Sequence, residues 1–306
     1  MKFIKDDLHL DFLGKWKPAA LLSTAVLVAG IAVYFPIGGL NYGIDFLGGT
    51  LVQVRFPSAV NIGEVRSILQ VGDFGSFELQ SFGEEDANEV LITLAGSQQE
   101  ETIEQGQSLA QRVGESLEAA YPGIVTRRVE SVGPKVGQEL KEAAAAAIVF
   151  ALLAILGYVW LRFQWRYGIA AVAATIHDVF FLLALFVFLQ SEITLPVVAA
   201  ILTIAGYSIN DSIVILDRIR DNVRRFQNMA FREIINDSLN QTMSRTLLTS
   251  MTTLLVVVSI YVFGGAIIRD FAFVLIVGVL IGTYSSIFIA SPLLLLLHHR
   301  FPIKAK

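Results

Sequence analysis

Six long apolar stretches constrain this sequence more than any other feature. A helix needs about 20 mostly apolar residues to cross a lipid bilayer. The stretches of that kind lie at 18–37, 139–161, 167–189, 193–217, 246–264 and 271–297. Apolar residues make up 54% of the chain and charged residues only 16%, against roughly a quarter in soluble domains. The sequence therefore predicts a polytopic α-helical membrane protein with six transmembrane helices.

Basic residues predict how these helices are oriented. Lys and Arg cluster in segment 1–17, between the second and third stretches, in segment 218–245, and in segment 298–306. All four regions fall on one side of the membrane for an even number of crossings, so the positive-inside rule places both termini in the cytoplasm. The first apolar stretch is too long for a cleaved signal peptide and no small-residue cleavage site follows it. We therefore expect an uncleaved anchor.

Segment 38–138 is polar enough to fold in water on the opposite, periplasmic side. Alternating and apolar runs predict strands at Leu51–Phe56, Phe77–Phe82, Glu89–Leu94 and Val125–Val132. Amphipathic patterns predict helices at Asn61–Leu69 and Ser97–Ala120. The order β-α-β-β-α-β is that of a ferredoxin-like α+β domain.

The formal net charge of −4 combines two unlike parts. Residues 38–139 hold 6 Lys or Arg and 15 Asp or Glu, a net charge of −9, so the rest of the chain carries +5. The acidic block has two interpretations: a solvated surface that keeps a small domain soluble, or a docking face for basic or unfolded polypeptide. A nucleic-acid partner is not expected, because no large basic face could neutralise phosphates.

Several chemistries lack their residues or motifs. The chain contains no Cys, which excludes disulfides, thiolate metal sites and cysteine nucleophiles. The nucleotide-binding P-loop, the zinc-protease H-E-x-x-H and the hydrolase G-x-S-x-G motifs do not occur. Asp178 and Asp211 permit an intramembrane aspartyl protease on chemistry alone, but the G-x-G-D sequence expected around one of them is absent. We expect no enzyme activity, no catalytic residue, no metal site and no cofactor.

Four polar residues lie inside or at the edge of the predicted spans. His177 and Asp178 are near the middle of the third, Asp211 is in the fourth, and Arg245 stands where the fifth begins. Charged residues within a membrane are costly and are usually functional or paired. Asp211 is therefore either half of an ion pair that fixes helix packing or a proton-titrating group whose protonation changes as Arg245 moves. Asp178 is favoured over His177 as a functional residue. His177 is read as a hydrogen-bonded packing residue or a relay, and as neighbours on a helix the two need not share a partner.

Segment 218–245 is too long for a simple turn. Apolar residues recur near helical spacing among its arginines: Ile219, Val223, Phe226, Ile234, Leu239 and Met243. This pattern predicts either an amphipathic helix lying on the inner membrane surface or a docking site for another subunit, and the sequence does not separate the two.

Four motifs, in order along the chain, resemble those of the SecD/SecF family. Gly43–Thr50 reads G-I-D-F-L-G-G-T, and Val132–Gly137 resembles the family's next signature. Gly206–Arg220 and Asn240–Ser250 are similar to its fourth-span and fifth-span motifs. The short exported segment is like that of the SecF branch, since SecD has a much larger one.

The resemblance implies a function and a set of partners. Proteins of the SecF branch pair with SecD in a complex that assists the SecYEG channel and uses the proton motive force to complete export of unfolded proteins. The implied fold is that of one half of a resistance–nodulation–division (RND) transporter, in the cytoplasmic membrane and in contact with its lipids. The family residues that match Asp211 and Arg245 are implicated in proton passage, beside a SecD aspartate that this chain lacks. The alternative is half of a proton-driven RND-type transporter for lipids or small molecules.

The glycine-rich signatures have two interpretations. The residues concerned are Gly43, Ile44, Asp45, Gly48 and Gly49 in the first signature and Gly133, Pro134 and Gly137 in the second. Their glycines either permit tight turns and close backbone approach, or they form a hinge between the membrane part and the exported domain.

Overall fold

The computed structural model describes residues 9–82, 87–95, 103–265 and 268–301. They form two compact units. The membrane unit consists of Ala147–Ser191 and the described residues before Asn41 and after Leu195. The second unit, Asn41–Ala146 together with Glu192–Leu195, is called the sheet domain below.

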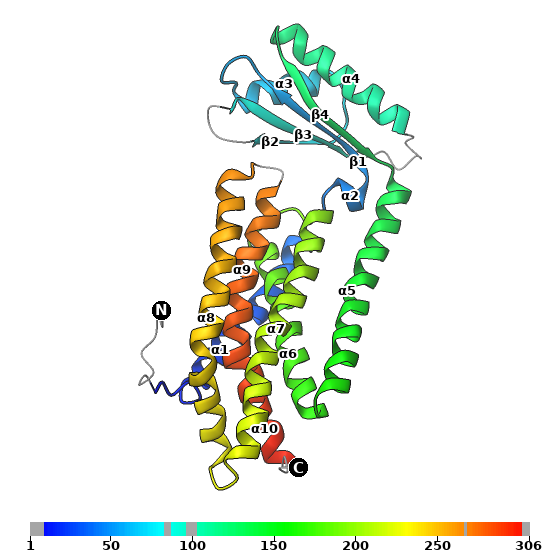
Figure 1. Ribbon diagram of the computed structural model, residues 1–306. Helices are drawn as coiled ribbons and strands as arrows, with labels where there is room; N and C mark the ends of the chain where they lie inside the picture. The colour runs from blue at the N-terminus through cyan, green and yellow to red at the C-terminus, as the bar shows by residue number, and fades with distance from the viewer. Residues whose placement is uncertain (1–8, 83–86, 96–102, 266–267, 302–306) are drawn as a thin grey trace. The chain divides into compact units, whose positions relative to one another are not determined.

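Within the described residues, six helical segments are long and apolar enough to cross a bilayer (Figure 1). The first five are α1 (Trp16–Ile37), α5 (Pro134–Arg162), α6 (Trp165–Leu189), α7 (Leu195–Arg225) and α8 (Phe231–Phe263). The last combines α9 (Arg269–Ser285), the π-helical turn η3 (Ser286–Ala290) and α10 (Ser291–Arg300). In their most apolar windows α1, α5 and α8 bury only 11%, 6% and 17% of residues within the chain, whereas α6 and α7 each bury 56%. Helices α1, α5 and α8 therefore have large apolar surfaces that no other part of the described chain covers.

The final span is not the continuous helix that the apolar run 271–297 predicts. Pro292 lies in the first turn of α10 and has no backbone N–H to continue the α-helical ladder. The α-helix is interrupted before Pro292 by the π-helical turn η3. There the Ser291 hydroxyl donates to the Ser286 carbonyl oxygen at 2.9 Å. π-helical turns of this kind are frequent at functional sites.

Small residues bring the membrane helices close together. A Cβ on Gly30 of α1 would lie 2.5 Å from the Ala184 Cβ of α6. On α9, a Cβ on Gly278 would lie 2.4 Å from the Ile204 side chain of α7, and one on Gly282 would lie 3.2 Å from the Ser208 Cβ. Lipid is as apolar as these side chains, so close van der Waals packing through small residues holds such helices together.

Segment 218–245, predicted as a separate amphipathic loop, is instead the continuation of α7 to Arg225 and of α8 from Phe231. Most of the apolar residues on which the membrane-surface interpretation depends pack inside the protein, although Phe226 is 40% exposed, and the membrane-surface and docking interpretations both stay predictions. Ile219, Val223, Ile234 and Leu239 are all buried in one cluster of the membrane unit.

Polar contacts also hold these two helical extensions. The buried Asn222 amide donates to Ser238 Oγ at 2.8 Å and to Gln241 Oε1 at 3.0 Å, which joins α7 to α8. The side chains of Asn236 and Asn240 on α8 each donate to the Leu10 carbonyl oxygen at 2.9 Å. These two bonds attach Leu10 to α8.

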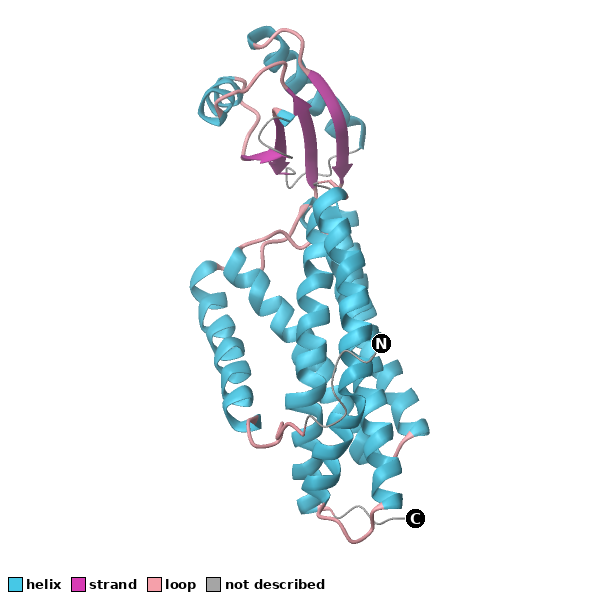
Figure 2. Cartoon of the chain, turned by 60° about the vertical axis from the view of Figure 1, so that its left-hand side comes forward, coloured by secondary structure: helices cyan, strands magenta, loops and turns pink. Residues whose placement is uncertain are grey.

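The sheet domain has the predicted ferredoxin-like order. Its elements are α2 (Ile44–Leu47), β1 (Gly49–Arg55), α3 (Ile62–Val71), β2 (Phe77–Phe82), β3 (Glu89–Ala95), α4 (Ile103–Ala120) and β4 (Val125–Val132). The strands pair antiparallel in the order β2-β3-β1-β4. Figures 1 and 2 show α3 and α4 on one face of this sheet. With the six spans, this domain confirms the predicted fold class.

Alternation along the strands builds the core of the sheet domain. Val52 and Val54 of β1 and Ile92 of β3 point to the helical face and are fully buried against Leu69 of α3 and Leu117 of α4. The side chain of Asn61 accepts from the Gly63 amide at 2.8 Å and caps α3, as its position before the helix predicts. Helix α2 was not predicted, and the predicted turn and helix start at 83–86 and 97–102 lie outside the described residues.

We predict that Gly30→Ala weakens the packing of α1 on α6. The new methyl group would collide with Ala184, including its Cα at 3.2 Å, so the two helices must separate. Overpacking of this kind typically costs about 1–3 kcal/mol. The apparent midpoint of thermal unfolding of the purified chain in detergent should fall. Gly157→Ala on α5 is the matched control, since nothing lies within 4 Å of its Cβ position. Equal midpoints for the two variants would contradict the packing.

Candidate functional site

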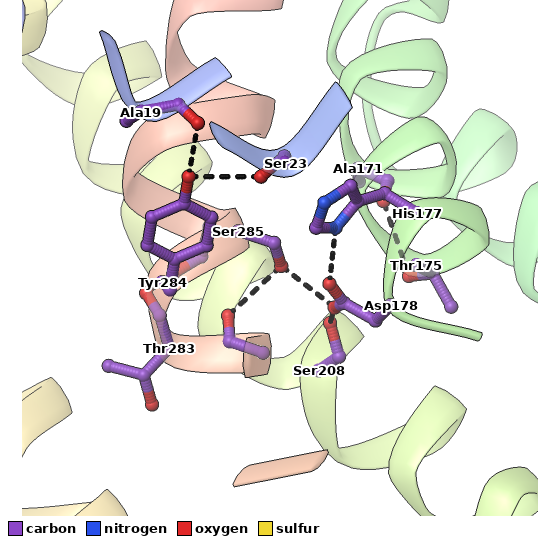
Figure 3. Close-up of polar contacts among 12 residues, drawn as sticks. Ala19, Ser23, Ala171, Thr175, His177, Asp178, Ser208, Thr283, Tyr284 and Ser285 are labelled. Atoms are coloured by element: carbon purple, nitrogen blue, oxygen red, sulfur yellow. Dashed lines mark hydrogen bonds and ion pairs between the residues drawn. The ribbon is translucent and has the colours of Figure 1, made fainter. Parts of the chain in front are cut away.

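A buried carboxyl group joins three helices of the membrane unit. Asp178 on α6 is fully buried, and its Oδ1 is hydrogen-bonded to His177 Nδ1 at 2.9 Å. Its Oδ2 accepts from the hydroxyl of Ser208 on α7 at 2.5 Å and from that of Ser285 on α9 at 2.7 Å. Figure 3 shows these side chains pointing toward one another. We call these four residues the Asp178 cluster.

The local sequence explains why the three helices meet at this point. Gly282 lies one turn before Ser285 and has no side chain, so α9 comes close to α7 beside Ser208. Ser285 ends α9, directly before the π-helical turn. Both hydroxyl groups are therefore short enough, and near enough, to reach one carboxyl oxygen.

A second set of contacts extends from His177 toward α1. The His177 ring lies 6.4 Å from the ring of Tyr284, centroid to centroid. The Tyr284 hydroxyl donates to the Ala19 carbonyl oxygen at 2.6 Å and shares a hydrogen bond with the Ser23 hydroxyl at 2.9 Å (Figure 3). His177 Nε2 is buried and has no hydrogen-bond partner among the described residues. Only one of the two ring nitrogens of His177 is therefore hydrogen-bonded within the described part of the chain.

Asp211 lies one turn after Ser208 on α7 and is 2% exposed. Its Oδ2 is buried without a hydrogen-bond partner in the described part of the chain. The Asp211 carboxyl interacts with the Thr283 hydroxyl through a hydrogen bond and with the Arg245 guanidinium through charge attraction. Thr283 is itself hydrogen-bonded to Ser250 of α8 at 2.7 Å, and Arg245 is an exposed residue of α8. Asp211 therefore sits among α7, α8 and α9.

The structure brings the predicted residues together in two groups. His177 and Asp178 bond directly to each other, a contact that their spacing along the helix did not predict. Asp211 and Arg245 form the second group. The hydrogen bonds of Asp178 go to His177 and two serines and not to Asp211. The two aspartates thus do not share a proton as a protease pair would.

Sequence reasoning missed Ser285, Thr283 and Tyr284, and assigned no role to Ser208. The available signal was weak, because Ser and Thr are common in membrane helices and usually bond to their own backbone. At the end of the Gly206–Arg220 motif, Asp217 forms an ion pair with Arg220 at 2.6 Å. Within the described residues, no three His, Asp or Glu side chains converge in a way that could hold a metal ion.

The glycine-rich signatures fold against each other within the sheet domain. Gly48 and Gly49 have φ angles of 75° and 139°, which favour glycine. A Cβ on Gly48 would lie 2.8 Å from the backbone of Pro134, and one on Gly137 would lie 2.9 Å from the Phe46 carbonyl oxygen. Close backbone approach therefore accounts for these glycines.

The first signature also holds the turn between α6 and α7. The backbones of Gly43 and Ile193 are hydrogen-bonded at 2.9 Å, and Tyr42 forms a parallel bridge with Ile193. The Asp45 carboxylate accepts from the backbone N–H of Leu195, the first residue of α7, at 2.8 Å. Asp45 thus caps the helix that carries Ser208 and Asp211.

Two family models match this chain. The model described as protein export membrane protein SecD/SecF, C-terminal, matches residues 112–300, and the SecD/SecF GG motif matches residues 33–59. The chain belongs to the SecD/SecF family. The resemblance drawn from the four motifs is confirmed.

Individual relatives agree with the SecD/SecF assignment. The protein translocase subunit SecF of Magnetococcus marinus is 45% identical, with 94% of this chain and 92% of that protein covered. The SecF of Vibrio alginolyticus is 40% identical, with 96% and 91% covered. The crystal structure of SecDF from Thermus thermophilus, described as a translocon-associated membrane protein, is similar with a TM-score of 0.85 and 35% identity. This chain is covered over 97% of its length but spans only 40% of that SecDF chain.

We predict that Asp45→Ala loosens the start of α7. The loss of an N-terminal cap costs about 1 kcal/mol, so the amides of Leu195 and of the residues that follow Pro196 in the first turn should exchange hydrogen about five-fold faster. Hydrogen–deuterium exchange of the full chain in detergent measures this. Asp45→Asn, which keeps an acceptor oxygen, should retain part of the protection. Glu78→Ala on β2 should leave this region unchanged. Unaltered exchange in Asp45→Ala would show that the SecD/SecF signature does not cap the helix.

We further predict that Asp178→Ala destabilises the membrane unit more than Ser208→Ala does. The first change leaves two serine hydroxyls and His177 without their acceptor, and each unsatisfied buried group costs about 1–3 kcal/mol. The second removes a single donor. Thermal unfolding in detergent should rank wild type above Ser208→Ala and Ser208→Ala above Asp178→Ala. Asp221→Ala, at an exposed carboxylate of α7, is the control. A reversed order would contradict the assignment of Asp178 as the shared hydrogen-bond acceptor of the cluster.

Proposed function

We propose that this chain acts as the SecF-type subunit of an export complex that uses the proton motive force to assist protein translocation. Membership of the SecD/SecF family and the curated SecF relatives support this role. Because the chain spans only 40% of the similar SecDF chain, a separate SecD subunit would supply the remaining part. The complex would assist SecYEG and act on the unfolded polypeptide in transit.

The observation that carries the proposal is the buried Asp211 carboxyl with an unpartnered oxygen beside Arg245. A carboxyl group within a membrane helix is costly to keep and is usually functional. When Asp211 takes up a proton it becomes neutral, and its attraction for the Arg245 guanidinium is lost. Arg245 is exposed on α8, so its side chain is free of the packing that would hold it in one place. Proton binding would then change the balance between two arrangements of α7 and α8.

The Asp178 cluster would act with Asp211 in the proton relay. Ser208 and Asp211 lie one turn apart on α7, so a rotation or shift of this helix moves both. His177 would exchange a proton through Nε2 while its Nδ1 stays bonded to Asp178. The SecD aspartate implied by the family resemblance would complete the path in the heterodimer.

The remaining assignments follow from the same proposal. The protein would lie in the cytoplasmic membrane with both termini cytoplasmic, supported by the basic residues that flank the spans. The uncovered apolar surfaces of α1, α5 and α8 would contact lipid and SecD. The proton gradient would serve as the energy source, with no cofactor, no enzymatic step and no nucleic-acid partner.

Asp211→Asn and Arg245→Met should each abolish proton-dependent export while the complex still assembles. The first variant cannot lose a proton, and the second has no charge to respond to the change. Export of a secretory protein into inverted membrane vesicles, with and without a proton gradient, measures this. Assembly is checked by co-purification with SecD.

Matched controls come from the same two helices. Asp221→Asn on α7 and Arg232→Met on α8 change exposed charges outside the site and should export like the wild type. Normal gradient-dependent export by both Asp211→Asn and Arg245→Met would refute the relay.

A further inference from the structure

A groove lies along one edge of the sheet domain, between α4 and β4. It encloses a cavity of about 820 Å³, within the range of about 300–1,000 Å³ typical of ligand sites. Its lining residues are Gln107, Ala110, Gln111, Gly114, Glu115, Glu118, Ala119, Ile124, Thr126 and Val129. None of them belongs to the signatures or to the site in the membrane unit.

The groove is open because small residues of α4 face an uncovered strand. Gly114 has no side chain, and a Cβ there would meet only the Thr126 hydroxyl, at 3.7 Å. Val129, whose partner Val52 faces the core, is nevertheless 41% exposed. An apolar side chain on the helical face of a sheet is normally covered by a helix. The exposed Val129 side chain at the bottom of the groove is therefore available to a bound ligand.

The edge of the sheet runs along the same groove. β4 is the last strand in the sheet order and, within the described residues, pairs only with β1. The outer edge of such a strand presents backbone N–H and C=O groups that can pair with an added extended strand. Recognition through the backbone accepts many sequences, while the groove receives alternate side chains.

Charge restricts the occupant further. Glu115 and Glu118 lie on the rim, and no Lys or Arg lines the groove. The arginines of β4 do not offset this charge, because Arg127 approaches Glu89 at 3.9 Å and Arg128 is paired with Glu130. Most of the sheet domain also falls in the sequence block 38–139, whose net charge is −9. The groove therefore favours an extended segment that presents both apolar and basic side chains on its groove-facing side.

We propose that the groove between α4 and β4 binds an extended, basic segment of polypeptide as an added strand at the edge of β4. The inference rests on the proposed function, since a chain in transit is unfolded and exposes its backbone. On the face of the added strand that turns toward α4, apolar side chains would lie on Val129 and Ala110, and basic side chains would approach Glu115. A folded partner or a small molecule would not need both the free strand edge and the acidic rim.

The test uses the full chain in nanodiscs of neutral phosphatidylcholine and two synthetic peptides. One peptide repeats Val-Ser-Lys-Ser, so that Val and Lys share one face of the strand, and the other replaces each Lys with Glu. Fluorescence anisotropy of the labelled peptides measures binding, with empty nanodiscs subtracted. The Lys peptide should bind, and the Glu peptide should bind at least ~10-fold more weakly. Equal affinity for the two would overturn the charge argument and with it the proposal.

Gly114→Trp fills the groove and should weaken binding of the Lys peptide by ~10-fold or more. Gln70→Trp places the same side chain at an exposed position of α3, away from the groove, and should bind like the wild type. Glu115→Lys keeps the groove open but reverses one rim charge at an exposed residue, so it tests the site even if Gly114→Trp misfolds. It should also weaken binding, whereas Glu78→Lys on β2 should not.

Two results would overturn the proposal. The first is unchanged binding of the Lys peptide to Gly114→Trp and Glu115→Lys. The second is a photocrosslinker at Gln111 that labels a second copy of the chain and not the peptide.

Failure of the groove proposal can be distinguished from failure of the proposed function. If Asp211→Asn blocks proton-dependent export but the groove variants bind peptide normally, the groove is wrong and the export role stands. If peptide binding depends on the groove but Asp211→Asn exports normally, the groove proposal stands and the proton-relay proposal is wrong.

Discussion

The membrane unit depends on close contact between helices in a solvent that gives them little reason to associate. Hydrocarbon tails surround an apolar side chain as favourably as another helix does, so packing and polar bonds must hold the bundle. The hydrogen bonds of Asp178 to Ser208 and Ser285 do this where α6, α7 and α9 meet. They are possible only because Gly282 lets α9 approach α7. The same glycine contact that packs the helices therefore also creates the polar site.

Helix α7 links the features that bear on function. Its first amide is capped by Asp45, its middle carries Ser208 and Asp211, and its far end is joined to α8 through Asn222. The family signature thus contacts the first residue of the helix whose later turns carry Ser208 and Asp211. This arrangement gives a physical reason for an acidic residue in a signature that otherwise consists of small and apolar residues.

Sequence patterns predicted the spans and the sheet domain well because both depend on local periodicity. Apolar runs marked the helices that cross the membrane, and alternation marked β1 to β4. The pattern was insufficient at Ile219, Val223 and Leu239, where a helical stripe predicted to face the membrane surface or another subunit packs within the protein. Periodicity tells which side of a helix is apolar and not what covers it. It also could not place Ser285 against Asp178, since that contact depends on how α9 lies against α6, and Pro292 was read as one residue of an apolar run.

An open sheet edge is a hazard for a protein unless something limits what can pair with it. Natural proteins protect such edges with charge, bulges or covering elements. β4 has a bulge opposite Gln53 and Val54, but its outer edge and the exposed Val129 remain open in the described part of the domain. The acidic rim and the net charge of −9 in this block repel a second copy of the same edge while attracting a basic segment. The charge that keeps the domain soluble and the charge that would select its occupant are therefore the same, and the two interpretations of the acidic block are not alternatives.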